Sequence, residues 1–160
     1  MKVLLIVPNW KWCEEEKNVN YPYPPFNLCL LAAIIEKHCT KVDVLDAYVD
    51  DLSQLQVMNE IKKFKPDLVG TTVLMDQLSY AGHEVCRIVK DVNKKIVTIM
   101  GGVYTTINTM HAIQNKNLDY ACAGEGEIVF PQFIQYLKKK VKELPEKGIV
   151  YKRNNEIINN

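Results

Sequence analysis

The chain has 160 residues, of which 48% are hydrophobic and 24% charged, and its 20 basic and 19 acidic residues give a formal net charge of +1. This is the composition of a single globular domain, and its balanced charge argues against nucleic acid or an anionic membrane as a partner. No apolar run reaches the length of about eighteen residues that a membrane helix needs. The five cysteines are scattered, without the spacing of a zinc or iron–sulfur loop, so reduced thiols and a cytoplasmic location are expected.

Apolar runs alternate with helical patterns along the chain. Strands are predicted at Val3–Val7, Val42–Leu45, Leu68–Thr72, Ile96–Met100 and Leu118–Cys122, and helices at Asn27–His38, Leu52–Phe64, Leu78–Val92, Thr105–Gln114 and Ile128–Glu143. The runs are apolar at nearly every position, as in parallel strands covered on both faces. Right-handed connections between such units predict an α/β fold, a flavodoxin-like doubly wound parallel sheet of five strands in the order 2-1-3-4-5.

A long first loop, residues 8–26, departs from this alternation. It carries Trp10, Trp12, Tyr21 and Tyr23 among several prolines. Loops of this length are usually functional or disordered, and the aromatic residues favour a packed segment at the carboxyl edge of the sheet. Two interpretations remain open: the aromatic residues cap the sheet edge, or they contact a ligand directly.

The C-terminal segment predicts a short β-hairpin. Pro145 ends the last helix, and residues 149–152 and 156–158 form two strand patterns around a turn at Asn154-Asn155. We therefore expect one domain over residues 1–145 and, over residues 146–160, a hairpin or linker toward a further domain.

Two glycine-containing turns predict the position of a site. Gly101-Gly102 follows the fourth strand, and Gly124-Glu125-Gly126-Glu127 follows the fifth. The carboxyl ends of parallel strands bind ligands in such folds, and glycine lets the backbone approach a ligand closely. The first strand, however, is followed by Pro8-Asn9-Trp10 rather than G-x-G-x-x-G, and no Walker lysine motif is present. A dinucleotide-binding fold is therefore excluded, and a small nucleotide-using enzyme is the less favoured alternative.

The strand ends resemble those of vitamin B12-binding domains. Thr72 and Leu74, followed by Gly101-Gly102, resemble the Ser-x-Leu and Gly-Gly elements of that family. The chain is more similar to one branch, the N-terminal domains of cobalamin-dependent radical SAM enzymes, whose fourth strand ends in Gly-Gly-x-His-x-Thr and whose fifth ends in Gly-Glu-Gly-Glu. Here Tyr104 stands at the histidine position. The prolines before Leu28 also resemble the start of the branch's first helix, and the similarity covers about residues 1–145.

The resemblance implies that cobalamin binds at this edge of the sheet. Small residues there would admit the nucleotide tail, and hydroxyl groups would satisfy its polar atoms, so a bulky residue at Gly102 is expected to occupy the path of the tail. The implied cofactor-binding residues are Pro8, Asn9, Trp10, Thr71, Thr72, Leu74, Gly101, Gly102, Val103, Tyr104, Thr105, Gly124, Glu125 and Gly126. Structural alternatives remain open: a tight turn at the glycine pair, Thr105 as a helix N-cap, and Glu125 and Glu127 as charges favoured at a helix N-terminus.

The chain lacks two further motifs that would carry chemistry. Without Asp-x-His-x-x-Gly after the first strand, no histidine is expected to bind cobalt, whose lower face would be open, water-bound or facing Asn9, Trp10 or an aromatic residue of the loop. Without Cys-x-x-x-Cys-x-x-Cys, the chain holds no radical SAM cluster, and we predict no catalytic or metal-ligating residue.

The resemblance therefore implies a cofactor module. Its parent protein would add a C-terminal radical SAM barrel with a 4Fe-4S cluster and S-adenosylmethionine. Such a parent would resemble a methyltransferase or the anaerobic magnesium-protoporphyrin IX monomethyl ester cyclase. The alternative is a non-enzymatic docking domain of the same fold that has lost its ligand.

Overall fold

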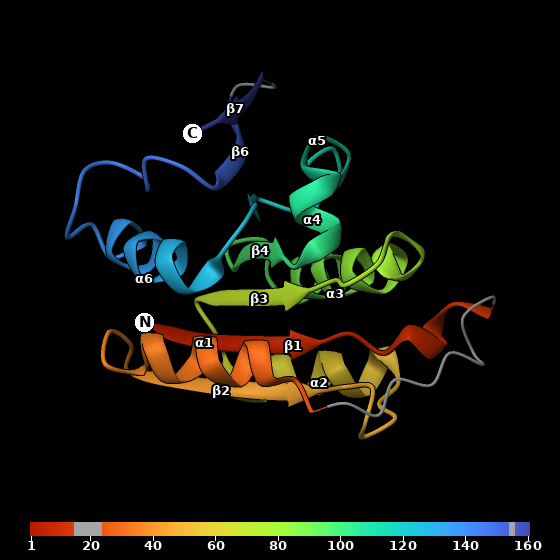
Figure 1. The fold of residues 1–160 in the computed structure, drawn as a ribbon. Coiled ribbons are helices and arrows are strands. Elements are labelled where there is room, and N and C mark those ends of the chain that lie inside the picture. The colour runs from red at the N-terminus through yellow and green to blue at the C-terminus, as the bar shows by residue number, and fades with distance from the viewer. Residues whose placement is uncertain (15–23, 154–155) are drawn as a thin grey trace.

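The computed structural model describes residues 1–14, 24–153 and 156–160. The strands are β1 (Lys2–Val7), β2 (Lys41–Asp46), β3 (Leu68–Thr72), β4 (Val97–Gly101), β5 (Tyr120–Cys122), β6 (Ile149–Arg153) and β7 (Glu156–Asn159). The α-helices are α1 (Phe26–Glu36), α2 (Gln54–Phe64), α3 (Ser79–Val92), α4 (Val103–Ile107), α5 (Thr109–Ala112) and α6 (Gly126–Leu137), with 3-10 turns η1 (Trp10–Trp12) and η3 (Asp76–Leu78). Figure 1 shows helices on both faces of one sheet.

The sheet has the order β2-β1-β3-β4-β5-β6-β7. Strands β1 to β5 pair in parallel, so the predicted fold class and the order 2-1-3-4-5 are confirmed. The predicted hairpin is present, but β6 pairs antiparallel with β5 and therefore extends the same sheet. The turn predicted at Asn154-Asn155 lies outside the described residues.

Two apolar layers hold the helices against the sheet. On one face, Leu5 of β1 belongs to a cluster with Leu28 and Ile35 of α1 and Phe130 of α6. On the other face, residues of β1 and β3 pack with α2 and α3 in a second cluster. The side chains of one strand point alternately to the two faces, so consecutive residues Leu4 and Leu5 contribute to different layers. Residues Val3 to Val7 of β1 are therefore all apolar, as the sequence predicted.

The fourth predicted helix differs from the structure. It begins earlier, at Val103, and is divided at Asn108 into α4 and α5. Thr105, Thr106 and Thr109 each donate a hydroxyl hydrogen bond to the carbonyl four residues before. Such bonds compete with the helical backbone pattern and bend or interrupt helices.

The last predicted helix is also shorter than expected. Helix α6 begins at Gly126 rather than Ile128 and ends at Leu137 rather than Glu143. Lys139 adopts a left-handed backbone with a φ of 55°, which stops the helix. The ammonium of Lys138 donates to the backbone carbonyl of His38 at 2.6 Å and ties this end of α6 to the end of α1.

The first loop begins with a packed turn. Asn9 caps η1, and the indole Nε1 of Trp12 donates to the carbonyl of Leu52 at 2.9 Å. The tyrosines expected to take part, Tyr21 and Tyr23, lie outside the described residues. In the part of the chain that the structure describes, no helix is long and apolar enough to cross a membrane.

Candidate functional site

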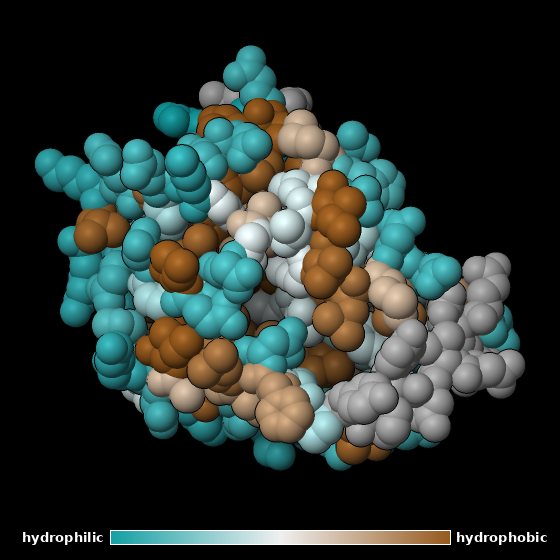
Figure 2. Space-filling view, in the orientation of Figure 1, coloured by the Kyte–Doolittle hydropathy of each residue, from teal (hydrophilic) through white to brown (hydrophobic). Residues whose placement is uncertain are grey.

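A cavity of about 340 Å³ opens at the carboxyl ends of β3, β4 and β5, on the sheet face covered by α1 and α6. Figure 2 shows it as a hollow near the middle of this face of the molecule. Its lining residues come from β1, the starts of α1, α4 and α6, and the strand ends between them: Leu5, Asn27, Leu28, Leu31, Gly70, Thr71, Thr72, Ile99, Gly101, Gly102, Val103, Thr106, Ile107, Cys122, Gly124, Glu125, Gly126, Glu127 and Phe130.

The floor of the cavity is apolar and depends on a glycine. A Cβ at Gly70 would lie 2.8 Å from Cδ2 of Leu5, 3.6 Å from Cγ2 of Ile99 and 3.8 Å from Cζ of Phe130. Those three side chains form the apolar floor of the cavity, and a side chain at position 70 would collide with Leu5. Glycine at this point of β3 therefore lets these side chains pack closely against the strand.

Gly102 shapes the turn from β4 into α4. Its φ is 99°, and a Cβ there would lie 2.4 Å from the carbonyl oxygen of Val73. The backbone of Val73 bonds to Gly101 and Tyr104 on either side of this glycine. The expectation that a bulky residue at Gly102 would occupy the ligand path is therefore wrong, because its side chain would collide with the backbone after β3.

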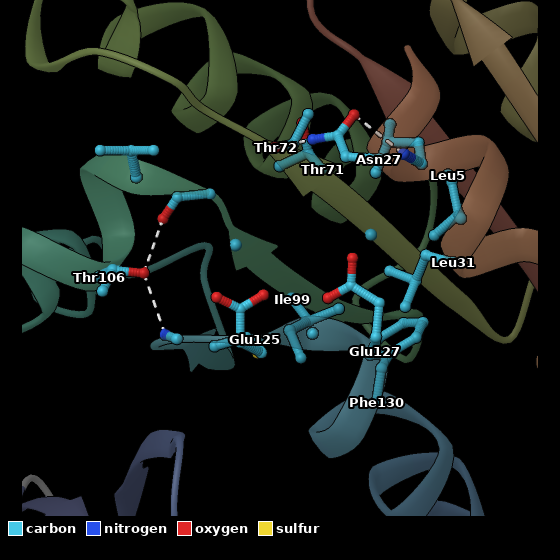
Figure 3. A pocket seen from close by; sticks show the side chains of 18 of the residues that line it. Leu5, Asn27, Leu31, Thr71, Thr72, Ile99, Thr106, Glu125, Glu127 and Phe130 are labelled. Atoms are coloured by element: carbon cyan, nitrogen blue, oxygen red, sulfur yellow. Dashed lines mark hydrogen bonds between the residues drawn. The ribbon is translucent and has the colours of Figure 1, made fainter. Parts of the chain in front are cut away.

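Most polar side chains of the cavity bond to the protein itself (Figure 3). The Thr71 hydroxyl donates to the carbonyl of Ile6 at 2.9 Å. The Thr106 hydroxyl donates to the carbonyl of Gly102 and accepts from the amide of Gly124, both at 3.0 Å. These bonds fix the two glycine turns relative to each other, so the cavity is held by the protein's own contacts.

Asn27 and Thr72 form a bridge between α1 and β3. The Nδ2 of Asn27 donates to the hydroxyl of Thr72 at 3.2 Å, while its Oδ1 accepts from the amide of Leu28. Both residues also line a smaller neighbouring cavity of about 90 Å³. The bridge therefore separates the two cavities.

Cys122 lies on the cavity wall near the acidic turn. Burial raises the pKa of its thiol to about 11, and the negative charge of Glu127 adds to that shift. The thiol is therefore protonated near pH 7 and is a poor nucleophile.

The structure brings together eight of the fourteen predicted site residues. Lining the large cavity are Thr71, Thr72, Gly101, Gly102, Val103, Gly124, Glu125 and Gly126. Trp10 and Leu74 line the smaller cavity. Pro8, Asn9, Tyr104 and Thr105 line neither, and Asn9 instead donates to Asp51 and to the carbonyl of Leu52.

Tyr104 and Thr105 point into the protein behind the turn. Thr105 lies within α4 and bonds to the carbonyl of Gly101, so it is not the N-cap, a position that Gly102 holds. The Tyr104 hydroxyl lies 3.0 Å from Nδ1 of His111 and 3.4 Å from Nε2 of His83. Burial, and secondarily the proximity of His111, lowers the pKa of His83. The third histidine, His38, bonds to Gln135, and none of the three lines either cavity.

Several lining residues were not among the predicted ones. They are Leu5, Asn27, Leu28, Leu31, Gly70, Ile99, Thr106, Ile107, Cys122, Glu127 and Phe130. Gly70 could have been predicted from the sequence, because a glycine inside a strand often marks a place where another group approaches the backbone closely. Phe130 could not have been predicted, since in sequence it is indistinguishable from the core residues of the same helix.

Comparison with known proteins identifies the family. Residues 17–134 match the B12 binding domain family. The chain is 30% identical over 161 residues to an uncharacterized methyltransferase of Pyrococcus horikoshii, covering 99% of this chain and 34% of that protein. It is 34% identical over 130 residues to the anaerobic magnesium-protoporphyrin IX monomethyl ester cyclase of Rubrivivax gelatinosus, covering 81% of this chain and 23% of the cyclase. The chain thus spans about a third or less of these relatives.

Solved structures share the fold. The radical S-adenosylmethionine methyltransferase TsrM of Kitasatospora setae superimposes with a TM-score of 0.81 at 17% identity, over 99% of this chain and 30% of that one. The cobalamin-dependent S-adenosylmethionine radical enzyme OxsB gives a TM-score of 0.78 at 22% identity, over 99% and 22% of the two chains. With its sheet order, its glycine turns and the family match over most of its length, this chain belongs to the B12-binding domain family.

Proposed function

We propose that this chain binds cobalamin, with the nucleotide tail in the large cavity and the corrin ring over its mouth. The observation that carries the proposal is the cavity itself, a space of about 340 Å³ at the carboxyl edge of the sheet in a chain of the B12-binding family. Its apolar floor of Leu5, Ile99 and Phe130 suits the planar base of the tail. Pockets of this size with a few placed polar groups bind small molecules and cofactors.

The residues around the mouth fit a broad ring with apolar faces. Val103 and Ile107 line the cavity yet are 52% and 74% exposed, so α4 presents an apolar surface beside the opening. A ring lying there would remove these side chains from water, which is favourable. When bound, cobalamin would supply a cobalt centre able to carry a methyl group or take part in radical chemistry, while this chain binds and orients it.

The parent protein would be a radical SAM methyltransferase or a tetrapyrrole cyclase. The support is the similarity to relatives that are about three or more times longer than this chain. In such a parent, residues 1–145 would be the cobalamin domain, and the hairpin of residues 146–160 would lead to a barrel holding the 4Fe-4S cluster and S-adenosylmethionine. A cytoplasmic location is part of this proposal, supported by the odd number and scattered positions of the five cysteines in the sequence.

Substitution of Gly126 is the sharpest test of the cavity. A Cβ at this position would lie 3.9 Å from the nearest atom, in Leu31, and Gly126 does not have a positive φ. A phenylalanine there can therefore enter the cavity without backbone strain. We expect the unmodified protein to retain hydroxocobalamin through desalting, seen by its visible absorbance, and Gly126→Phe to retain almost none.

Two variants control for effects on folding. Ile128→Phe places the same side chain on α6 at a position that is 66% exposed, and Gly126→Ala adds only a methyl group. Both should retain the cofactor, and all variants should show the same circular dichroism spectrum as the unmodified protein. A colourless unmodified protein would favour the docking-domain alternative, whereas full retention by Gly126→Phe would show that the tail lies elsewhere.

A further inference from the structure

Most polar side chains of the large cavity bond to the protein, and a few keep the capacity to form a hydrogen bond with a ligand. Thr71, Thr106 and Asn27 bond to the protein, as described above. Thr72 is only 7% exposed, its hydroxyl accepts from Asn27, and no described residue accepts its proton. The hydroxyl hydrogen of Thr72 is thus one donor on the β3 wall that a ligand could engage.

The opposite wall carries two carboxylates, that of the exposed Glu125 and that of Glu127. Glu127 is the second residue of α6 and is partly buried. In Figure 3 its carboxylate points into the cavity near Leu31 and Phe130. Within the described part of the chain it has neither a hydrogen bond nor an ion pair, although the start of a helix favours its charge. An ionised carboxylate only accepts, so this side chain recognises groups that donate.

The nucleotide tail contains groups that donate hydrogen bonds and one group that only accepts them. Its ribose hydroxyls can donate to a carboxylate, whereas its phosphodiester is an anion that a carboxylate repels. The base at the end of the tail would lie deeper, over the apolar floor. The sugar is therefore the part of the tail that matches a carboxylate on the cavity wall.

We infer that Glu127 accepts a hydrogen bond from a ribose hydroxyl of the tail and so selects complete cobalamin over corrinoids that lack the nucleotide. This inference rests on the proposed cobalamin function and adds a residue that determines specificity. Hydrogen bonds to charged groups are about twice as strong as neutral ones, so the contact should contribute measurably to affinity.

Titration of each variant with two corrinoids tests the inference. The ligands are hydroxocobalamin and aquocobinamide, which has the same ring but no phosphate, ribose or base. Glu127→Ala should weaken hydroxocobalamin binding by about tenfold, the effect of losing a hydrogen bond to a charged group, and leave aquocobinamide affinity unchanged. Glu127→Asp keeps the charge at the helix start but shortens the side chain, and it should weaken only hydroxocobalamin as well.

The controls separate this inference from a structural role and from the proposed function. Glu143→Ala removes an exposed carboxylate beyond the end of α6 and should change neither affinity. Equal losses of affinity for both corrinoids would mean that Glu127 only stabilises α6 through its charge. The same conclusion would follow if Glu127→Asp bound hydroxocobalamin like the unmodified protein. If the unmodified protein binds both corrinoids and no Glu127 variant differs, only this inference fails. If it binds neither, the proposed function fails too.

Discussion

At the scale of single residues, the two glycines after β4 have different roles. Gly102 has a φ of 99° and a ψ of −179°, a backbone region used almost only by glycine. Gly101 is not among the glycines with positive φ, and a Cβ there would lie at an ordinary 3.8 Å from Cβ of Cys122. Gly102 thus allows the turn to pass close to the backbone of Val73. Gly101 lines the cavity without adding a side chain to its wall.

Substitution by alanine should separate these roles. Gly102→Ala should lower the free energy of unfolding by about 3 kcal/mol or more, because strain and a 2.4 Å approach to the Val73 oxygen add together. Gly101→Ala should cost less than about 1 kcal/mol. Urea denaturation of both variants measures the difference, and equal losses would contradict this account of the turn.

The sequence predicted the two glycine turns but not what each glycine does. Two adjacent glycines look alike in sequence, and their different roles depend on how closely β3 passes each of them. Likewise, Glu127 follows a recognisable motif, but its free carboxylate becomes visible only once α6 is placed against Leu31 of α1.

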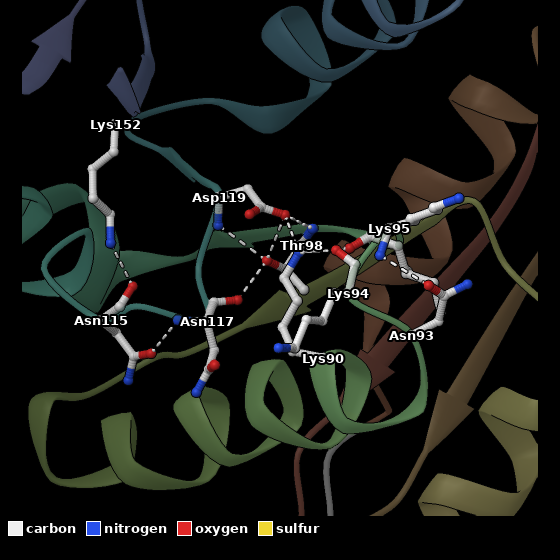
Figure 4. Close-up of polar contacts among 10 residues, drawn as sticks. Lys90, Asn93, Lys94, Lys95, Thr98, Asn115, Asn117, Asp119 and Lys152 are labelled. Carbon is white, nitrogen blue, oxygen red and sulfur yellow. Dashed lines mark hydrogen bonds and ion pairs between the residues drawn. The ribbon is translucent and has the colours of Figure 1, made fainter. Parts of the chain in front are cut away.

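At the scale of elements, an ion pair joins α3 to the edge of the sheet that lies opposite the cavity. The Lys90 ammonium donates to Oδ2 of Asp119 at 2.5 Å and to the carbonyl of Ile96 at 2.7 Å. The same Asp119 oxygen accepts from the amide of Thr98 at 2.9 Å (Figure 4). Because the Lys90 side chain is only 13% exposed, solvent screens this pair less than a surface pair. It joins α3, β4 and the segment before β5.

Breaking this pair should destabilise the fold without affecting the cavity. Asp119→Asn removes a charge from a partly buried pair, and we expect the free energy of unfolding to fall by about 1–3 kcal/mol. Lys90→Met should have an effect of the same size, whereas Lys94→Met, on an exposed residue after the same helix, should be near neutral. Thermal or urea unfolding measures these changes. An unchanged midpoint in both Asp119→Asn and Lys90→Met would show that the pair contributes nothing.

Helix boundaries were the least predictable feature at this scale. The spacing of apolar residues predicted the approximate positions of the helices, because residues on the buried face of a helix recur with its period. It did not predict the break at Asn108, since hydroxyl groups at three threonines compete for backbone carbonyls there. Nor did it predict the end of α6, which follows from the left-handed residue Lys139.

At the scale of the whole molecule, the order of the parallel strands followed from the regular alternation of strands and helices. The hairpin was predicted, but its attachment to β5 was not, because edge pairing depends on which strand is left free. The edge of the sheet at which the cavity opens was predicted, but its complete lining was not. Its walls come from α1, β3, α4 and α6, segments far apart in the chain that meet only in the folded sheet.

The cavity also has a consequence for how the protein responds to hydrostatic pressure. The cavity of about 340 Å³ opens to solvent, but water packs imperfectly against its apolar floor, and that unfilled space is lost when the chain unfolds. Pressure favours the state of smaller volume, so it should unfold the cofactor-free protein comparatively easily. Gly126→Phe, which fills part of this space from within, should unfold at higher pressure than Ile128→Phe, as followed by tryptophan fluorescence in a pressure cell. Equal midpoints would mean that the cavity contributes little to the volume change of unfolding.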